Sequence, residues 1–347
     1  MTKTYQVHRS TRASKIAMSL ALVLVLLLAA APWWAGRGDM RMLVEIFTYV
    51  GLAQMWSLLA GYGGLVSIGQ QAFVGLGGYV LFALAIFAGV HPVAGLFLAG
   101  AVAALVAIPT ALVAFRLQGA YFAIGTWVIA EVFRLGFAQV SALGGGSGLS
   151  LPATIVRDMA ANVSAREALV YWLALGLAVG SIAMVYLLLR SRWGLAMTAI
   201  RDSEDASESL GVETWRTKLV VYIATAGMTG LIGALIFLQK LRISPDAAFS
   251  VNDWTALVIF IVVIGGIGSI EGPIIGVIVF FLLREFAADW GAWYMILLGG
   301  IAVVTMLIAP RGIWGWISER YDLQLFPVRR QLVVVGAADK SETREQE

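Results

Sequence analysis

VAGLFLAGAVAALVAIPTALVAF, residues 93–115, contains no charged side chain and is long enough to cross a lipid bilayer as one helix. An α-helix rises about 1.5 Å per residue and the hydrocarbon core is about 30 Å thick, so about 20 apolar residues suffice. Stretches of similar length and character recur along most of the chain. They lack the alternation with period two that a membrane barrel requires. The sequence therefore predicts an all-α fold, a polytopic bundle of transmembrane helices.

The composition excludes most other classes of protein. Of the 347 residues, 60% are hydrophobic and 13% are charged, whereas a soluble domain carries about 25% charged residues. A soluble enzyme and a disordered chain are therefore excluded as the main body. The chain has no cysteine and two histidines, so we expect neither a disulfide framework nor a metal site. The net charge of +3 fits membrane orientation and lipid contact, and we expect no nucleic-acid partner.

The apolar runs predict about ten spans, with one or more of them broken or re-entrant. They cover residues 16–34, 42–60, 72–90, 93–115, 121–139, 169–189, 219–238, 254–270, 273–286 and 293–309. The alternative for the first run is a secretory signal peptide, but its Pro-Trp-Trp ending is typical of a membrane interface. The run at 273–286 is short, so a partial or re-entrant helix is the alternative there.

The distribution of Lys and Arg predicts which side each loop faces. Basic residues concentrate in residues 1–15, in the loop 190–218 and in the tail 311–347, whereas the long loops 140–168 and 239–253 hold four between them. Cytoplasmic segments carry the excess of basic residues. We therefore expect both termini and the loop 190–218 in the cytoplasm.

Arg37 and Arg41 are exceptions to the excess of basic residues on the cytoplasmic side, because they fall in the short first loop on the outer side. The end of the tail, residues 339–347, is a run of mixed charge that predicts disorder.

The loop 190–218 contains a predicted short helix, roughly residues 203–210. Asp202 is a suitable N-cap, the acidic Glu204 and Asp205 then fall in the first turn, and Gly211 fits a helix stop. Ala206 and Leu210 share one face of this helix. The alternatives are a solvated connector and a helix that docks into a groove of a cytoplasmic partner.

Residues 61–71 are too polar and too rich in glycine for a helix that faces lipid. Their backbone must be buried in protein or line a cavity. Ser67, Gln70 and Gln71 supply hydrogen-bonding groups there, so tight packing and a broken helix beside a transport path are both open. The similar segments 64–68 and 266–270 suggest an internal duplication. No phosphate-binding loop occurs in the chain, so we expect no ATP hydrolysis by this chain itself.

Charged side chains within the spans are the other candidates for function. Glu131 and Arg134 are three residues apart and can pair on one helical face. The pair is either a structural ion pair or part of a translocation path. Glu45 lies four residues into its span, from where it can reach the interface by snorkelling, and Arg284 is expected at the membrane interface.

The chain resembles a known family in five places that occur in the family's order. They are RDSEDASESLGV (residues 201–212) followed by Lys218-Leu219, GYGGLVSIGQ (61–70), GAYFAI (119–124), Ser244-Pro245, and GGIGSIEGP (265–273). In these motifs the chain is similar to the permease subunits of branched-chain amino acid ABC importers, specifically the M-type, LivM-like subunit. The resemblance covers roughly residues 42–310.

This resemblance implies that the chain moves branched-chain amino acids, or a related small amino acid or amide, across the membrane by alternating access. It also implies a set of partners. It implies a permease domain at 16–310, a sister permease of the H type, two ATP-binding subunits, and a periplasmic substrate-binding protein. In the family the loop helix couples to the ATPase, which here implies Asp202, Ser203, Glu204, Asp205, Ala206, Ser207, Glu208, Ser209, Leu210 and Gly211. The chain would bind no cofactor, and ATP would be used by the partners in the bacterial inner membrane.

We take Ser67, Gln70, Gln71, Tyr121, Glu131 and Arg134 as candidates for the translocation path. Two other functions remain as alternatives. An ion-coupled secondary transporter needs several intramembrane carboxylates, and only Glu131 and Glu45 are central. A membrane-embedded enzyme needs a catalytic constellation, which the spans do not offer.

Overall fold

The computed structural model of the chain describes residues 4–8, 12–160, 162–287, 293–309, 311–321, 325–326 and 331–335. The principal helices are α1 (Arg12–Ala29), α2 (Arg37–Ser57), α3 (Gln70–Phe87), α4 (Pro92–Ala114), α5 (Ala120–Gln139), α7 (Val163–Arg190), α10 (Thr214–Lys240), α12 (Leu257–Gly265), α13 (Glu271–Ala287) and α14 (Trp293–Ile308). Shorter elements join them: β1 (Thr4–His8), η1 (Ala31–Trp33), η2 (Leu58–Tyr62), η3 (Ser141–Leu143), η4 (Gly145–Ser147), β2 (Leu149–Ser150), α6 (Ala153–Asp158), α8 (Arg192–Asp202), α9 (Glu204–Ser209), β3 (Arg242–Ile243), α11 (Pro245–Ala248), η5 (Asn252–Ala256), α15 (Gly312–Tyr321) and β4 (Gln331–Val335).

The predicted helical bundle is confirmed. Within the described residues, nine helical segments are long and apolar enough to span a membrane. One of these runs through α11, η5 and α12 as a single segment, Pro245–Gly265. Beside them α13, with 17 residues, occupies the position of the short run at 273–286. The chain is therefore a multi-pass membrane protein.

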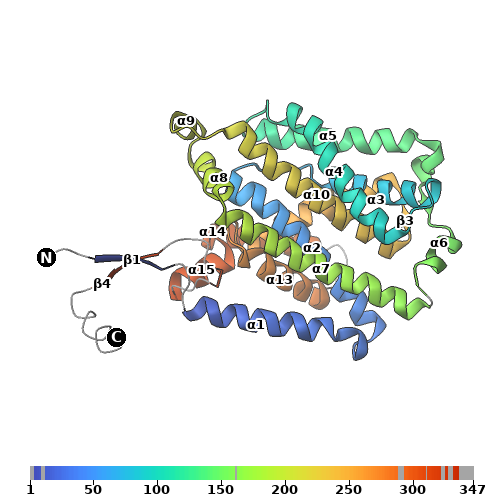
Figure 1. The fold of residues 1–347 in the computed structure, drawn as a ribbon, viewed down its shortest axis with the longest axis horizontal. Helices are drawn as coiled ribbons and strands as arrows, with labels where there is room; N and C mark the ends of the chain where they lie inside the picture. The colour runs from blue at the N-terminus through green and yellow to red at the C-terminus, as the bar shows by residue number, and fades with distance from the viewer. Residues whose placement is uncertain are drawn as a thin grey trace, which may run out of the picture.

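The centre of the bundle is built around α10, which packs against α2, α3, α4 and α7 (Figure 1). Glycines let these helices approach closely. A Cβ at Gly77 of α3 would overlap the carbonyl oxygen of Gly230 in α10, and a Cβ at Gly233 would overlap the backbone of Val74. Lipid is as apolar as the side chains, so the hydrophobic effect does not drive helices together within a membrane. Small residues allow close van der Waals packing between the helices instead.

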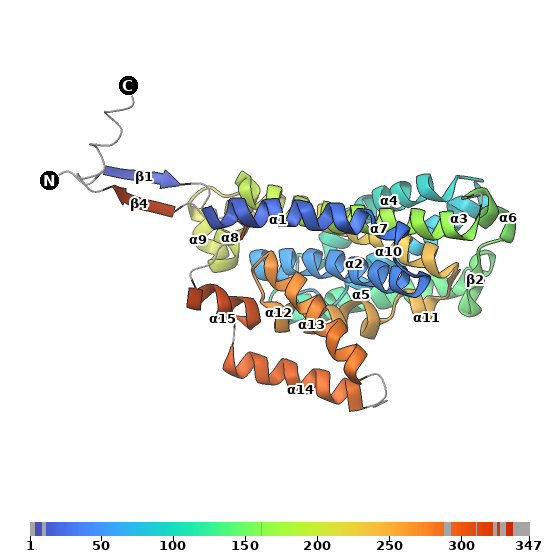
Figure 2. The same cartoon turned by 90° about the horizontal axis from the view of Figure 1, so that it is seen from below.

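The first helix, α1, lies along the outside of the bundle with its apolar side chains exposed (Figure 2). Two aromatic side chains of α7 hold its end. The Tyr171 hydroxyl donates to the carbonyl oxygen of Leu28 at 2.7 Å, and Trp172 Nε1 donates to that of Ala29 at 3.0 Å. This attachment leaves the apolar face of α1 for lipid.

The first and last strands of the described residues meet at one end of the bundle. β1 pairs antiparallel with β4, with Thr4 opposite Val335. Both strands project from the end that carries α8 and α9, which we call the loop end (Figure 1); the opposite end is the outer end. An even number of membrane crossings, as expected from ten spans, places the segment before the first span and the segment after the last span on the same side. The predicted disorder of residues 339–347 concerns a segment outside the described residues.

The close contact of α3 with α10 predicts a large effect of Gly77→Val. The added side chain would force the two backbones apart, with an expected loss of about 2–3 kcal/mol in the free energy of unfolding. Thermal unfolding of the detergent-purified protein, followed by size-exclusion chromatography, measures this. Gly176→Val is the matched control, because a Cβ at Gly176 of α7 has no atom within 4 Å. Equal stability of the two variants would contradict the role assigned to this contact.

Candidate transport path and coupling surface

The loop 190–218 folds as two helices instead of one. The predicted short helix is confirmed as α9, and Gly211 ends it with a positive φ of 85°. The preceding helix, α8, was not predicted. The assignment of Asp202 as N-cap is wrong: Ser203 caps α9, with its Oγ accepting from the Ala206 N–H at 3.3 Å. Asp202 is the last residue of α8, and its carboxylate is bound by the Arg201 guanidinium at 2.9 Å.

One face of α9 is anchored and the other is free. Ser207 is buried, and Glu204 forms an ion pair with Lys218 of α10. The Glu208 carboxylate accepts from the Thr214 hydroxyl at 2.6 Å. On the other face, Leu210 is 85% exposed and Ala206 is also exposed. Of the ten predicted coupling residues, Asp202, Ser203, Asp205, Ala206, Glu208, Ser209, Leu210 and Gly211 are exposed, Glu204 is half-buried and Ser207 is buried.

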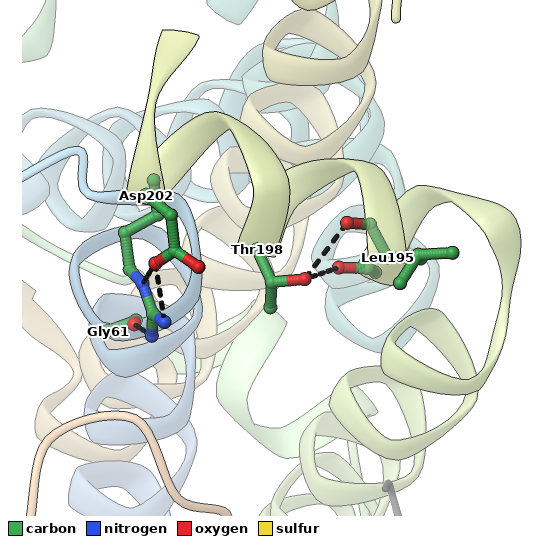
Figure 3. A network of polar contacts seen from close by, with 6 residues as sticks. Gly61, Leu195, Thr198 and Asp202 are labelled. Carbon is green, nitrogen blue, oxygen red and sulfur yellow. Dashed lines mark hydrogen bonds and ion pairs between the residues drawn. The ribbon is translucent and has the colours of Figure 1, made fainter. Parts of the chain in front are cut away.

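α8 rests on the glycine-rich segment that follows α2, as Figure 3 shows. Arg201 Nη1 donates to the carbonyl oxygen of Gly61 at 2.9 Å. The fully buried Met197 lies against Gly63, where a Cβ would overlap its methyl group. Gly64, with φ of 68°, places its backbone beside the Arg201 side chain. The position of α8 is therefore fixed by the turn that ends α2.

That turn opens into a stretch of non-helical backbone, residues 64–69, which we call the α2–α3 break. One buried side chain of α2 satisfies a carbonyl group of the break, and the two glutamines that follow the break bond to α2 and η5. Trp56 Nε1 donates to the carbonyl oxygen of Ser67 at 2.8 Å, and Gln70 Nε2 donates to that of Leu52 at 2.9 Å. Gln71 Oε1 accepts from the Thr255 hydroxyl. Irregular backbone at membrane depth is tolerated where protein surrounds it in this way.

A second break, residues 266–270 between α12 and α13, lies against α2 and the turn that follows it. A Cβ at Gly61 would overlap the backbone of Gly268. Gln54 Nε2 of α2 donates to the carbonyl oxygen of Ile270 at 2.6 Å. The second of the two similar segments, 266–270, thus lies against α2 and the turn at Gly61, which precede the first segment, 64–68. Their common origin stays a prediction.

α5 covers the α2–α3 break. The Ile68 N–H donates to Thr126 Oγ1 at 3.1 Å, and Gly69 lies so close to Thr126 that a Cβ would overlap its backbone. The opposite face of α5 has no partner within the described residues, and its large hydrophobic side chains are exposed. They are Tyr121, Ile124, Trp127, Val128, Val132 and Leu135.

The predicted ion pair on α5 is present and has a third member. Arg134 Nε donates to Glu131 Oε1 at 2.9 Å, and Arg134 Nη1 donates to Asp246 Oδ1 of α11 at 2.7 Å. Both members of the predicted pair are half-buried. The network ties α5 to α11 near the outer end.

The six predicted path residues therefore form two groups. Ser67, Gln70 and Gln71 are buried in the bundle behind α5. Tyr121, Glu131 and Arg134 lie on α5 itself, and Tyr121 is 74% exposed. The two groups of residues are connected only through the contact of α5 with the α2–α3 break. The role of these residues in a translocation path stays a prediction.

Three long-range polar contacts were not predicted from the sequence. They are Arg201 with Gly61, Arg134 with Asp246, and Glu45 with Arg284, whose Nη1 and Nη2 bind the two carboxylate oxygens at 2.6 and 2.8 Å. Each joins residues more than 100 positions apart. No local pattern of residue types could have indicated them.

Comparison with known proteins identifies the family. Residues 40–307 match the family described as "Branched-chain amino acid transport system / permease component". The chain belongs to this family of branched-chain amino acid transport system permeases. The permease LivM of Escherichia coli (strain K12) is 30% identical over 328 residues, covering 86% of this chain and 76% of that protein.

Other relatives have related names. The permease LivM of Salmonella typhimurium is 28% identical and covers 86% of this permease and 76% of its own length. A probable permease LivH of Methanocaldococcus jannaschii is 24% identical over 144 residues, covering 39% of this chain and 44% of that protein. No solved structure gives a match.

The contact of Arg201 with Gly61 predicts a local effect on the permease. Arg201→Gln removes a charged donor to a buried carbonyl, a loss of about 1.5–3 kcal/mol. We expect faster hydrogen exchange at Leu65, whose amide donates to Leu59 at 2.9 Å, by about tenfold or more. Mass spectrometry of the protein in nanodiscs measures it.

Arg192→Gln provides the control for this experiment. Arg192 lies on the same helix and is exposed, and its guanidinium lies over the ring of Trp193 instead of reaching the break. Exchange at Leu65 that rises equally in both variants would show that charge on α8, and not the contact with Gly61, controls the break.

Proposed function

We propose that this chain is a permease subunit of an ATP-binding-cassette importer that moves branched-chain amino acids, or a related small amino acid or amide, by alternating access. The observation that carries the proposal is the link from α9 to the transmembrane core. α9 exposes Ala206 and Leu210, and α8 connects it to the α2–α3 break through Arg201 and Gly61.

In this proposal α9 is the coupling helix. A short helix with a small apolar face and acidic neighbours can fill a groove on a partner, and the partner here is an ATP-binding subunit. Because α9 is held by the ion pair of Glu204 with Lys218, a displacement of the docked helix moves α8 and α10 as well. Through Arg201 the displacement reaches the break, behind which Gln70 and Gln71 lie.

The other partners follow from the remaining surfaces. The unpartnered apolar face of α5 suits a sister permease of the H type, with the path between the two subunits. A periplasmic substrate-binding protein would contact the outer end, around Ser244, Pro245 and Asp246 and the glycine-rich residues 144–148. ATP would be hydrolysed by two ATP-binding subunits, with no cofactor bound by this chain.

The proposed location is the bacterial inner membrane. Both termini and the loop 190–218 would be cytoplasmic, with residues 1–15 before the permease domain at 16–310 and a tail at 311–347. The shared position of β1, β4, α8 and α9 at the loop end supports this orientation. Ion-coupled secondary transport is not favoured, because the family is one of transport-system permeases.

The coupling role of α9 is tested by Ala206→Arg with Leu210→Asp. Removing a central apolar contact costs about 2 kcal/mol or more in an interface, and the added charges oppose docking. We expect the ATP-binding subunit that co-purifies with the parent protein to fall by tenfold or more. Quantitative immunoblotting of the detergent-solubilised complex measures this.

The matched control carries the same types of substitution at the outer end. Ala153→Arg with Val163→Asp changes one exposed residue of α6 and one of α7. Retention of the ATP-binding subunit by the α9 variant, at the level of this control, would exclude α9 as the docking site.

The role of the ion pair on α5 is tested separately by Glu131→Gln. If the pair borders the path, uptake of leucine into proteoliposomes falls severalfold while assembly with the ATP-binding subunit stays normal. Uptake is measured with ATP inside and ion gradients collapsed. Unchanged uptake with normal assembly would assign Glu131 a structural role only.

A further inference from the structure

A pocket of about 600 Å³ lies at the outer end of the bundle, away from α5 and from the coupling surface. Its walls come from the first turns of α2 and α7 and from the last turns of α10, and Trp254 of η5 contributes one side. Because α7 leads into α8 and α9 leads into α10, this end of α7 and α10 is opposite the loop end. The pocket is therefore at the boundary of the outer leaflet.

The charge around the pocket is predominantly positive. Three cations, Arg41, Arg166 and Lys240, and two carboxylates, Glu45 and Glu167, line it. Both carboxylates are already bound by cations, Glu45 by one from outside the lining and Glu167 by one from outside and one from within it. Arg284 binds Glu45 through both of its Nη atoms, and Arg37 approaches Glu167 at 3.5 Å while Arg41 binds it at 2.9 Å.

Two of the lining cations have no carboxylate partner within the described residues, namely Arg166 and Lys240. The Lys240 amine lies 4.8 Å from the centre of the Trp254 ring and 5.8 Å from that of Phe237. Such a contact orients an ammonium group without neutralising its charge. The mouth of the pocket thus offers two charges for an anion.

The inner wall of the pocket is apolar. Its lining includes the following buried side chains: Met40, Val44, Val170, Ile236, Leu238 and Trp254. A positive mouth over an apolar wall is the complement of an anionic amphiphile. Basic pockets between transmembrane helices bind anionic lipid head groups elsewhere.

The size of the pocket and the depth of its apolar wall exclude two other occupants. A zwitterionic amino acid has no net charge to meet the excess of cations, and it would leave most of a 600 Å³ pocket empty. The surface of a folded protein does not reach the recessed apolar wall formed by Val170 and Ile236.

We propose that this pocket is a binding site for an anionic phospholipid of the outer leaflet. The phosphate lies between Arg166 and Lys240, and the upper part of an acyl chain lies on the apolar wall. The site also accounts for the position of Arg41, one of the two arginines that break the positive-inside rule. The assignment to the outer leaflet rests on the orientation proposed above, whereas the binding site itself does not depend on the transport function.

The test is a titration of the purified permease complex with phosphatidylglycerol or phosphatidylcholine, followed by native mass spectrometry. The parent protein should bind phosphatidylglycerol more tightly than phosphatidylcholine. Each cation near a membrane surface contributes about a fivefold change in affinity, so Arg166→Gln with Lys240→Gln should weaken phosphatidylglycerol binding about thirtyfold. Arg166→Lys with Lys240→Arg should restore it.

The matched control is Arg157→Gln with Arg242→Gln, which removes two cations from the outer end but none from the pocket lining. We expect its lipid binding to equal that of the parent. Equal weakening in both double variants, no preference for phosphatidylglycerol, or displacement of the lipid by millimolar leucine would each overturn the proposal. Size-exclusion profiles confirm that every variant is folded.

Discussion

The non-helical backbone between α2 and α3 is the constraint on which the rest of the bundle depends. At membrane depth each unpaired N–H or C=O group costs several kcal/mol unless protein satisfies it. Two side chains bond to this segment directly: Trp56 of α2 donates to the carbonyl oxygen of Ser67, and Thr126 of α5 accepts from the Ile68 N–H. Arg201 of α8 and Gly268 of the second break hold the preceding turn at Gly61. Their positions are therefore fixed together, so none of these elements can move far without exposing a polar group or moving the others.

This interdependence gives the proposed coupling a physical form. A docked helix transmits force only if it is stiffly attached, and α9 has six residues with little packing of its own. Its stiffness comes from the ion pair of Glu204 with Lys218 and from α8, whose Met197 is fully buried. In the proposed coupling, α8 with the turn at Gly61 would be the lever that enters the membrane, and α9 would be the part that contacts the ATP-binding subunit.

Local signals in the sequence predicted part of this arrangement. The spans, α9 with its stop at Gly211, and the pairing of Glu131 with Arg134 follow from apolar runs or from spacing within one helix. α8 was missed because its mixed composition, RWGLAMTAIRD, resembles a connector. The N-cap of α9 was misplaced because Asp202 and Ser203 are both good caps, and only the engagement of Asp202 by Arg201 separates them.

The pairing of β1 with β4 has a consequence for biogenesis. Thr4 of β1 lies opposite Val335 of β4, so β1 can pair only after all the spans between the two strands have been made. The two can meet only if the number of insertions is even, since an odd number leaves them on opposite sides of an impermeable barrier. Formation of this small sheet therefore reports that the membrane crossings between the two strands are even in number.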